Sequence, residues 1–376
     1  MKTNTILIQN IITPYRSRLF NVLSLKHFDF SVFYMAKTEV DRNWDASRIM
    51  MKHKFWLDRY GIYFCIKNFH IHINPILTLK VLFSRSTKNI ILGASYNDIN
   101  VIALVVAKKM HMTNKRFFFW AEANYLTNGA RSESKFKCWL RKFVFSSVDG
   151  ALIIPGKMSE LTFKKWGIVD KKYIRLPNTI SDDKLQYCPE KRNKETIPIF
   201  FMPIRLIESV KGAINFFEAI GRENIEKCRF WIAGDGEDKE LYKEYIEKNN
   251  YTQNIELLGF CDSNRMEELY NTANVFVLPS FSDPSPLSMV EALKTHLPIL
   301  CSLHCGNHYE VVDDEINGYC FNPLDQEDIK VKFEALFFRK NEWIQMGELS
   351  YSKYLKIYAT ENVAANFIRQ YNLISK

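Results

Sequence analysis

The eight cysteines of this 376-residue chain are scattered along it. They form no disulfide-like framework, which is typical of a protein of a reducing cytoplasm. Long apolar runs are also missing: the longest, Val101 to Ala107, falls far short of the roughly 20 residues that span a bilayer. The first apolar run, Ile6 to Ile8, is interrupted by Gln9, so we expect no secretory signal. These absences favour a protein that is soluble or lies on a membrane.

Positive charge is distributed unevenly. Residues 1–177 hold 29 of the 51 lysines and arginines but 11 of the 42 acidic residues, a net charge of +18. The remaining residues carry −9, which leaves +9 for the whole chain. A basic half suits an anionic membrane face, a pyrophosphate-linked acceptor or nucleic acid. Because no nucleic-acid recognition motif accompanies the charge, we expect no nucleic-acid partner.

Short apolar runs alternate with helix-like segments in both halves of the chain, which predicts parallel sheets with helices on both faces. Helices are expected at Pro14–Leu25 and Asp98–Met110. The expected strands are Asn4–Ile11, Phe30–Met35, Asn89–Gly93, Arg116–Trp120, Gly150–Ile154, Pro198–Ile204, Arg229–Ala233, Ile255–Leu258, Val275–Leu278 and Pro298–Cys301.

This order of elements predicts two domains. We expect Rossmann-like domains over residues 1–177 and 197–355, joined by a polar linker over 178–196. Residues 356–376 form a further segment, in which Val363, Phe367 and Tyr371 are spaced for one face of a helix. Since ligands of doubly wound sheets bind at the carboxyl ends of the strands, we expect a shared cleft there.

Two carboxylates, Asp283 and Glu291, stand eight positions apart on a loop that leads from an expected strand into an expected helix. Backbone N–H groups between them are free to face an anion. One acid for sugar hydroxyls, a helix N-terminus for a diphosphate and one acid for a ribose diol would suit a nucleotide-sugar. From this segment alone, an ordinary strand–loop–helix with two solvated acids is an equal alternative.

With other motifs in the same order along most of the chain, this segment resembles the donor-binding region of the retaining glycosyltransferases of family 4. The further motifs are Leu176–Asn178, Arg205–Leu206, Lys211–Gly212, Trp231–Gly236, Leu257–Phe260 and Asn317–Tyr319. Pro14–Arg16 and the acid-Pro-x-x-Leu form are similar to a subgroup that builds bacterial surface polysaccharides. The resemblance implies the α/β fold called GT-B: two doubly wound Rossmann-like domains facing a central cleft. In that fold the last helix usually crosses back to the first domain.

The resemblance also implies the roles of donor-site residues. Arg205 and Lys211 would clamp the diphosphate and stabilise its departing charge, so that no metal or other cofactor is required. Glu291 would accept the ribose hydroxyls. Asp283 would bind sugar hydroxyls and support the positive charge that develops at the anomeric carbon. The departing phosphate would take the acceptor proton, so no separate general base is needed. The remaining expected donor-binding residues are Gly234, Gly259, Phe260, Pro286, Leu287 and Ser288.

Three residues depart from the family pattern. Asp283 stands where the family usually has the longer glutamate, and Ile204 where a glycine commonly precedes the arginine. Pro286 stands where a glycine often lets the backbone approach phosphate, and proline has no N–H to donate. These departures leave open a second interpretation, a non-enzymatic scaffold that kept the fold. A nucleotide-sugar epimerase or hydrolase on the same architecture is a third.

On the acceptor side we expect Tyr15, Arg16, Trp120 and Glu122 to contribute. Glu122 ends an expected strand where many family members have a histidine, and we count it among the catalytic residues. It would bind a sugar hydroxyl or the acceptor nucleophile, although a purely structural acid is an equal alternative. Arg16 would meet acceptor phosphate, with a cation on a helix surface as the alternative.

Two further segments have alternatives. Residues 134–146 combine aromatic residues with lysines at helical spacing, which suits an anionic membrane interface or a helix packed on the first domain's sheet. Cys301, His304, Cys305 and His308 could suggest a zinc site, but paired C-x₂-C spacings are absent and we disfavour zinc binding.

From these features together we expect a cytoplasmic enzyme, peripheral on the inner face of the plasma membrane. It would move a hexose-like sugar from a nucleotide-sugar to a glycan acceptor, one that is lipid-linked.

Overall fold

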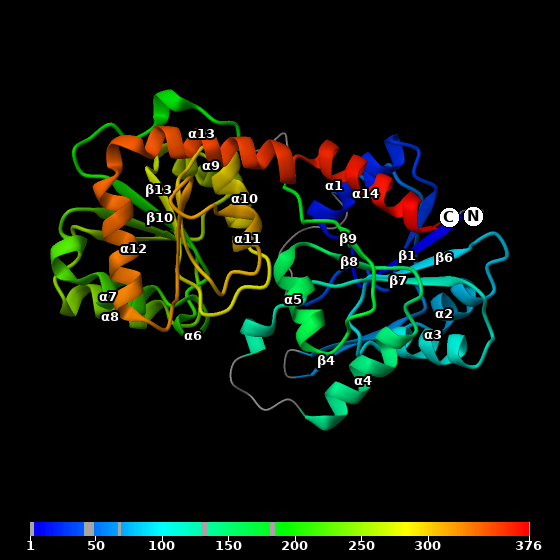
Figure 1. Ribbon diagram of the computed structural model, residues 1–376. Coiled ribbons are helices and arrows are strands. Elements are labelled where there is room, and N and C mark those ends of the chain that lie inside the picture. Colours follow the sequence, from blue (N-terminus) through cyan, green and yellow to red (C-terminus); the bar gives the residue numbers. More distant parts are fainter. Residues whose placement is uncertain (1–3, 41–48, 67–68, 129–133, 181–184, 376) are drawn as a thin grey trace.

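The computed structural model describes residues 4–40, 49–66, 69–128, 134–180 and 185–375. They form two α/β domains, the first in the blue-to-green part of the chain and the second in the green-to-orange part (Figure 1). Each contains a parallel sheet with helices on both faces, as the alternating sequence pattern predicts. The prediction of a GT-B arrangement is confirmed.

The first domain contains a seven-stranded parallel sheet in the order β3-β2-β1-β6-β7-β8-β9. Its strands are β1 Thr5–Gln9, β2 Phe30–Tyr34, β3 Phe55–Leu57, β6 Asn89–Leu92, β7 Arg116–Trp120, β8 Leu152–Ile154 and β9 Tyr173–Arg175. Its helices are α1 Pro14–Leu25, α2 Pro75–Leu82, α3 Ile99–Lys109, α4 Lys135–Ser146 and α5 Lys157–Lys165. An antiparallel hairpin, β4 Ile62–Ile66 and β5 Phe69–Ile73, lies outside this sheet.

Both faces of this sheet are buried, so its strands are continuous apolar runs rather than alternating ones. Phe117 and Phe119 pack in the core on one face, while Phe118 and Trp120 pack in the core on the other. Polar side chains therefore gather where the strands end. This places Gln9, the last residue of β1, and Glu122, two residues after the end of β7, at the carboxyl edge of the sheet.

The second domain repeats the topology with six parallel strands in the order β12-β11-β10-β13-β14-β15. The strands are β10 Ile199–Pro203, β11 Arg229–Ala233, β12 Ile255–Gly259, β13 Val275–Leu278, β14 Ile299–Ser302 and β15 Gly318–Phe321. The helices are α6 Glu208–Lys211, α7 Ala213–Ile225, α8 Lys239–Lys248, α9 Ser263–Thr272, α10 Leu287–Lys294, α11 His308–Val311, α12 Gln326–Phe338 and α13 Trp343–Lys353.

The last helix, α14 (Thr360–Ser375), leaves the second domain and packs on the first, as the red helix in Figure 1 shows. Val363, Phe367 and Tyr371 are buried in the core that β1, β2 and α1 form. The Tyr371 hydroxyl also forms a hydrogen bond of 3.0 Å with Thr5 Oγ1 on β1. Helix α14 thus connects the second domain to the first.

Several elements differ from the sequence-based expectation. The short strands β3 and β9 and the hairpin β4–β5 were not predicted, and Gly318, within the Asn317–Tyr319 motif, begins β15. The sequence signal is weak at β3 and β9 because each has only three residues, fewer than a periodic pattern needs. Among the described residues, no helix is long and apolar enough to cross a membrane.

Candidate functional site

The centre of the site is an ion pair between Lys211 and Asp283. Lys211 Nζ lies 2.6 Å from Asp283 Oδ2, and both side chains are about 15% exposed. Lys211 ends the short helix α6, and Asp283 follows β13 on the loop to α10. The structure therefore brings together two residues that the resemblance assigns to one donor site. A lysine so placed has further N–H donors for a phosphate oxygen beside the carboxylate.

The backbone around Gly212 explains why Lys211 reaches this position. Gly212 has a φ of +62°, which turns the chain from α6 into α7 and which glycine adopts at low cost. A Cβ atom here would lie 2.9 Å from the Phe281 ring and 3.0 Å from the Pro279 carbonyl oxygen. The Ser282 N–H donates to the Val210 carbonyl (3.2 Å), so α6 and the loop after β13 are held together.

Arg205 lies at the end of β10, and its position depends on two glycines after β11. A Cβ on Gly234, whose φ is +144°, would lie 1.9 Å from the Ile204 carbonyl oxygen. A Cβ on Gly236 would lie 2.2 Å from the Leu206 carbonyl oxygen. The Arg205 side chain is exposed and makes no ion pair within the described ranges. Ile204 stands where the family commonly has glycine. Its side chain is buried in the hydrophobic core of the second domain, which has room for it.

Glu291 lies in the second turn of α10, beside a buried tyrosine from α9. The Tyr270 hydroxyl donates to Glu291 Oε2 at 2.7 Å and also lies 3.2 Å from the Ser288 carbonyl oxygen. Burial, with the neighbouring Glu291 carboxylate, raises the pKa of Tyr270 well above its usual value, so the phenol remains a donor. Tyr270 thus orients the carboxylate that is expected to accept ribose hydroxyls.

The first turn of α10 carries Leu287 and Ser288, and it has no side-chain cap. Pro286 occupies the N-cap position and removes one of the four N–H groups that a helix leaves unpaired at this end. The following residues keep theirs, and the macrodipole favours an anion beside them. The proline carbonyl is held by Asn307 Nδ2 at 3.0 Å. Pro286 therefore reduces the number of donors without blocking the helix terminus.

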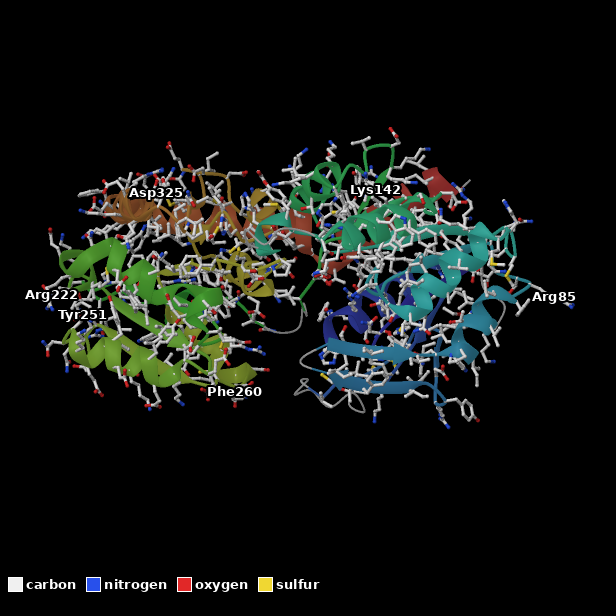
Figure 2. All side chains as sticks on the ribbon, turned by 90° about the horizontal axis from the view of Figure 1, so that it is seen from below. Arg85, Lys142, Arg222, Tyr251, Phe260 and Asp325 are labelled. Carbon is white, nitrogen blue, oxygen red and sulfur yellow. The ribbon has the colours of Figure 1, made fainter. Side chains whose placement is uncertain are left out.

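The end of β12 supplies an exposed aromatic residue. Gly259 has a φ of +68°, and Phe260 after it is 79% exposed at the surface of the second domain (Figure 2). An exposed ring beside a strand end is suited to stacking on a planar group such as a nucleotide base.

Asn124, which follows β7, connects the two domains at this site. Its Nδ2 atom donates to the carbonyl oxygens of His304 (3.2 Å) and Asp283 (3.5 Å). A second cross-domain contact joins Glu310 on α11 to the first turn of α5, where the Lys157 N–H donates to Glu310 Oε1 at 2.6 Å. Burial raises the pKa of this carboxyl group. The carboxyl ends of β7 and β13 therefore meet through direct hydrogen bonds.

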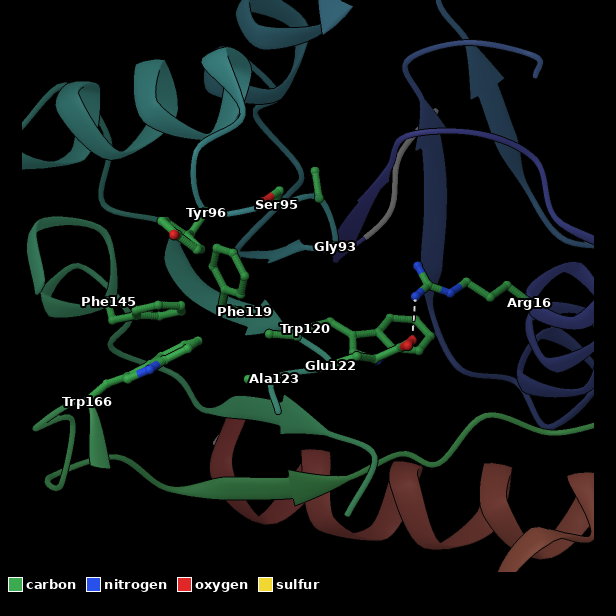
Figure 3. Close-up of a pocket in the computed structure, with 12 residues that line it drawn as sticks. Arg16, Gly93, Ser95, Tyr96, Phe119, Trp120, Glu122, Ala123, Phe145 and Trp166 are labelled. Atoms are coloured by element: carbon green, nitrogen blue, oxygen red, sulfur yellow. Dashed lines mark hydrogen bonds and ion pairs between the residues drawn. The ribbon is translucent and has the colours of Figure 1, made fainter. Parts of the chain in front are cut away.

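The acceptor-side residues form a second cluster, of which Arg16, Trp120 and Glu122 are drawn in Figure 3. Arg16 Nη2 donates to Glu122 Oε1 at 2.8 Å, and Arg16 Nη1 donates to Gln9 Oε1. The guanidinium also lies over the Trp120 ring, 4.5 Å from its centre, and 5.8 Å from the Tyr15 ring centre. The positive charge of Arg16 is thus compensated within the protein.

A pocket of about 340 Å³ lies beside this cluster. Arg16, Trp120 and Glu122 line it together with an aromatic group drawn in Figure 3. The aromatic group consists of Tyr96, Phe119, Phe145 and Trp166. Aromatic walls with a few polar groups at one side are typical of sites that bind small organic ligands.

The cysteine and histidine residues after β14 are used in other contacts. His304 Nδ1 donates to the Phe281 carbonyl oxygen (2.8 Å) and His308 Nδ1 to the Cys305 carbonyl oxygen (2.7 Å). Cys301 Sγ contacts Cys320 Sγ at 3.7 Å. In the part of the chain that the structure describes, no three such residues are grouped as metal ligands.

The predicted site residues thus fall into two groups, donor-side and acceptor-side, that Asn124 links. Tyr270 and Asn124 were missed by sequence reasoning. Tyr270 lies in the last turn of α9, where an aromatic residue predicts only a packed helix face. The signal for Asn124 was its place two residues after Glu122, beyond the same strand.

The family described as "Glycosyl transferases group 1" matches residues 186–351, which carry the donor side of the site. The chain is similar to the alpha-monoglucosyldiacylglycerol synthase of Acholeplasma laidlawii, with 28% identity over 51% of this chain and 46% of that protein. It is also similar to an Escherichia coli enzyme, with 27% identity over 50% of this chain and 51% of that protein. That enzyme is UDP-Gal:alpha-D-GlcNAc-diphosphoundecaprenol alpha-1,3-galactosyltransferase. The chain thus spans about half the length of these relatives.

Among solved structures, HepE of Anabaena in complex with UDP is similar over 99% of this chain and 100% of its own, with a TM-score of 0.74 and 12% identity. The lipopolysaccharide outer core galactosyltransferase WaaB has a TM-score of 0.70 and 13% identity over 97% of this chain and 98% of its own. At such identity these likenesses establish the fold. The resemblance seen in the sequence is therefore confirmed: residues 186–351 match the glycosyl transferases of group 1, within a chain that has the GT-B fold.

Proposed function

We propose that the protein is a retaining glycosyltransferase that moves a hexose-like sugar from a nucleotide-sugar to a glycan. The observation that carries this proposal is the group formed by Lys211, Asp283 and the uncapped start of α10, inside the segment that matches the group 1 family. Cations, a carboxylate and free N–H groups on adjacent strand ends are the chemistry that a sugar diphosphate requires.

In this proposal the nucleotide lies along the second domain. Glu291, oriented by Tyr270, accepts hydrogen bonds from the ribose hydroxyls, and Phe260 contacts the base. Lys211 and Arg205 bind the diphosphate, which acquires charge as the glycosidic bond breaks. HepE was crystallised with UDP and with UDP-glucose, which supports a uridine nucleotide as the first donor to test.

In the proposed reaction, negative charge develops on the departing phosphate oxygen and positive charge on the anomeric carbon beside it. As the bond from the anomeric carbon to the phosphate oxygen breaks, Asp283 supports the positive charge on the sugar. The acceptor hydroxyl attacks from the face on which the phosphate leaves, and the departing phosphate oxygen takes its proton. The configuration at the anomeric carbon is therefore retained. Glu122, paired with Arg16, orients the acceptor hydroxyl.

We also propose that the acceptor is lipid-linked and that the enzyme works in the cytoplasm, on the inner face of the plasma membrane. On α4, Phe136 (66% exposed) and Trp139 (56% exposed) stack with ring centres 5.9 Å apart, and Phe143 follows at 5.3 Å from Trp139. Exposed lysines flank this row, among them Lys142, which lies on the surface of the first domain (Figure 2). Aromatic rings beside lysines suit an anionic lipid surface.

A product assay tests this proposal. The protein is incubated with UDP-glucose, UDP-galactose or UDP-N-acetylglucosamine and a lipid-linked glycan extract, and the new anomeric proton is examined by NMR. An α-linked product from an α-linked donor is expected. Release of UDP and free sugar without transfer would favour a hydrolase, and a changed sugar without transfer an epimerase. Neither binding nor turnover of any nucleotide-sugar would favour a scaffold.

A further inference from the structure

The start of helix α5, in the first domain, is capped by a residue of the second domain. α5 follows Gly156, which has no side chain to accept a hydrogen bond from the first N–H groups of the helix. The Lys157 N–H donates instead to Glu310 Oε1 on α11, at 2.6 Å. A carboxylate in this place also meets the positive end of the helix macrodipole. Glu310 therefore acts as the N-cap of a helix that lies in the other domain.

Gly156 leaves the space that this carboxylate occupies. A Cβ atom on Gly156 would lie 2.4 Å from Glu310 Oε2 and 2.6 Å from its carboxyl carbon. The φ of Gly156 is −167°, an extended conformation that any residue adopts, so space rather than backbone freedom explains the glycine. Burial raises the pKa of the Glu310 carboxyl group, whereas the Lys157 N–H and the charge of Arg175 lower it. The contact thus has the shape and the partners that a carboxylate requires.

The segment before α11 joins Glu310 to the donor side of the site. The Gly306 N–H donates to the Asp283 carbonyl oxygen at 2.8 Å. Asn307 Nδ2 donates to the carbonyl oxygen of Pro286, the N-cap residue of α10, at 3.0 Å. The position of Glu310 is therefore tied to the loop that carries Asp283 and to the start of α10.

Helix α5 holds the acceptor side in a similar way. Ser159 Oγ donates to the Ala123 carbonyl oxygen (2.8 Å) and accepts from the Ala123 N–H (3.1 Å). Thr162 Oγ1 accepts from the Tyr125 N–H at 3.1 Å. Because Ala123 directly follows Glu122, α5 fixes the backbone of the segment that carries this acid. The contact between Glu310 and α5 thus completes a chain of hydrogen bonds from the donor side to the acceptor side.

We propose that Glu310 is a positioning residue for sugar transfer: by capping α5 it sets the distance between Asp283 in one domain and Glu122 in the other. The proposal rests on the proposed function and concerns a residue outside the donor and acceptor groups described above. Reacting atoms must approach to about 3–3.5 Å, and a displacement of about 1 Å can cost on the order of 10²-fold in rate. Loss of the cap should therefore slow transfer while the nucleotide binds as before.

Initial-rate kinetics and calorimetric titration with UDP, both on the full chain, test the proposal. In Glu310→Ala we expect kcat to fall roughly 10- to 100-fold. KM for the donor and Kd for UDP should change by less than about twofold. Glu310→Gln keeps an oxygen that accepts from the Lys157 N–H, so it should lose roughly fivefold or less, since a neutral hydrogen bond is about half as strong. The matched control is Glu223→Ala, which removes an exposed carboxylate paired with Lys227 and should keep full activity.

A double-mutant cycle separates the cap from a general structural role. Gly156→Ala displaces the carboxylate and should slow transfer about as much as Glu310→Ala does. Added to Glu310→Ala, it should have no further effect, because the cap is already lost and the new methyl group has room. Small-angle X-ray scattering of the UDP complexes gives a second measurement that needs no acceptor. The radius of gyration should increase in Glu310→Ala and in Gly156→Ala but not in Glu223→Ala.

The proposal is overturned if Glu310→Ala keeps the wild-type kcat, if the two substitutions act independently, or if the radii of gyration are equal. It is also overturned if Glu310→Ala loses UDP binding, because Glu310 would then support the second domain itself. In each of these cases a wild type that binds UDP and transfers sugar retains the proposed function. Absence of both UDP binding and transfer in the wild type would reject the proposed function, and the positioning role with it.

Discussion

Lys211 and Asp283, which are 72 positions apart in the sequence, form an ion pair of 2.6 Å where α6 and the loop after β13 meet. The pair holds the carboxylate of Asp283 and the ammonium of Lys211 together on the loop that leads from β13 into α10. A sugar diphosphate bound there would contact both partners at once. From this geometry we predict the effects of replacing Lys211 and of replacing two residues that position the site, Tyr270 and Gly234.

Replacing Lys211 should affect the reaction more than the fold. Lys211→Met removes a charge that stabilises the departing diphosphate, so kcat should fall by about 10²- to 10³-fold. The free energy of unfolding should fall by about 1–3 kcal/mol, because the largely buried Asp283 carboxylate loses its partner. Initial-rate kinetics with the active nucleotide-sugar test this. Lys227→Met, an exposed lysine in a helix-surface pair, is the control and should keep full activity.

Removing the Tyr270 hydroxyl should weaken donor binding. Tyr270→Phe leaves Glu291 without the hydrogen bond that orients it, and such a bond to a charged group contributes about 1.5–3 kcal/mol. We therefore expect KM for the donor to rise by roughly tenfold or more, with kcat changed less. Tyr371→Phe also removes a buried hydroxyl, in the first domain, and should leave KM unchanged. Equal KM values for both variants and the wild type would contradict the role given to Tyr270.

A methyl group on Gly234 should destabilise the second domain. The Cβ of Gly234→Ala would meet the Ile204 carbonyl oxygen at 1.9 Å, and the φ of +144° is unfavourable for alanine. We expect a loss of about 3 kcal/mol in the free energy of unfolding and displacement of the adjoining Arg205. Gly167→Ala is the matched comparison, since its φ is +75° but nothing lies within 4 Å of its Cβ. It should cost about 1–2 kcal/mol. Urea denaturation of the three proteins measures the difference.

The first domain should lose stability in mild acid through His53. Burial lowers the pKa of His53 from 6.5 to about 4, and the neutral ring is held by Tyr34 and Asn21. Because the folded-state pKa is depressed, the stabilisation is present above pH 6.5 and is lost as the pH falls towards 4. The loss should approach roughly 3 kcal/mol. Unfolding measured between pH 4 and 7.5 should show a weaker pH dependence in His53→Gln; identical pH profiles would refute the assignment.

Much of the fold could be predicted because local signals agree with the tertiary structure. α1 has the expected bounds because Pro14 at its first position starts the helix, and its apolar residues face the sheet. β7, β11 and β13 were predicted to the residue because buried parallel strands are continuous apolar runs. The hairpin β4–β5 was missed because its exposed positions include Ile62, Phe64 and Ile66, so no polar alternation marks it.

The site residues could be predicted from the sequence only where charged side chains follow the end of an expected strand. Asp283, Glu291, Arg205 and Lys211 could be named because they occur in an ordered set of motifs. Their pairing could not, since no pattern within the sequence says that Lys211 lies against Asp283. The contacts of Arg16 with Gln9 and Glu122 likewise depend on packing across the sheet edge. Tertiary contacts, rather than local propensity, decide these features.

Calorimetric titration with UDP tests the central claim most directly, because it needs neither the acceptor nor the correct sugar. We predict saturable binding to the wild type, weakened at least tenfold in Lys211→Met and in Glu291→Gln but unchanged in Lys227→Met. The same titration with the other nucleoside diphosphates would identify the preferred base. Absence of binding by every nucleoside diphosphate, or equal binding by all three variants and the wild type, would contradict the donor site described above.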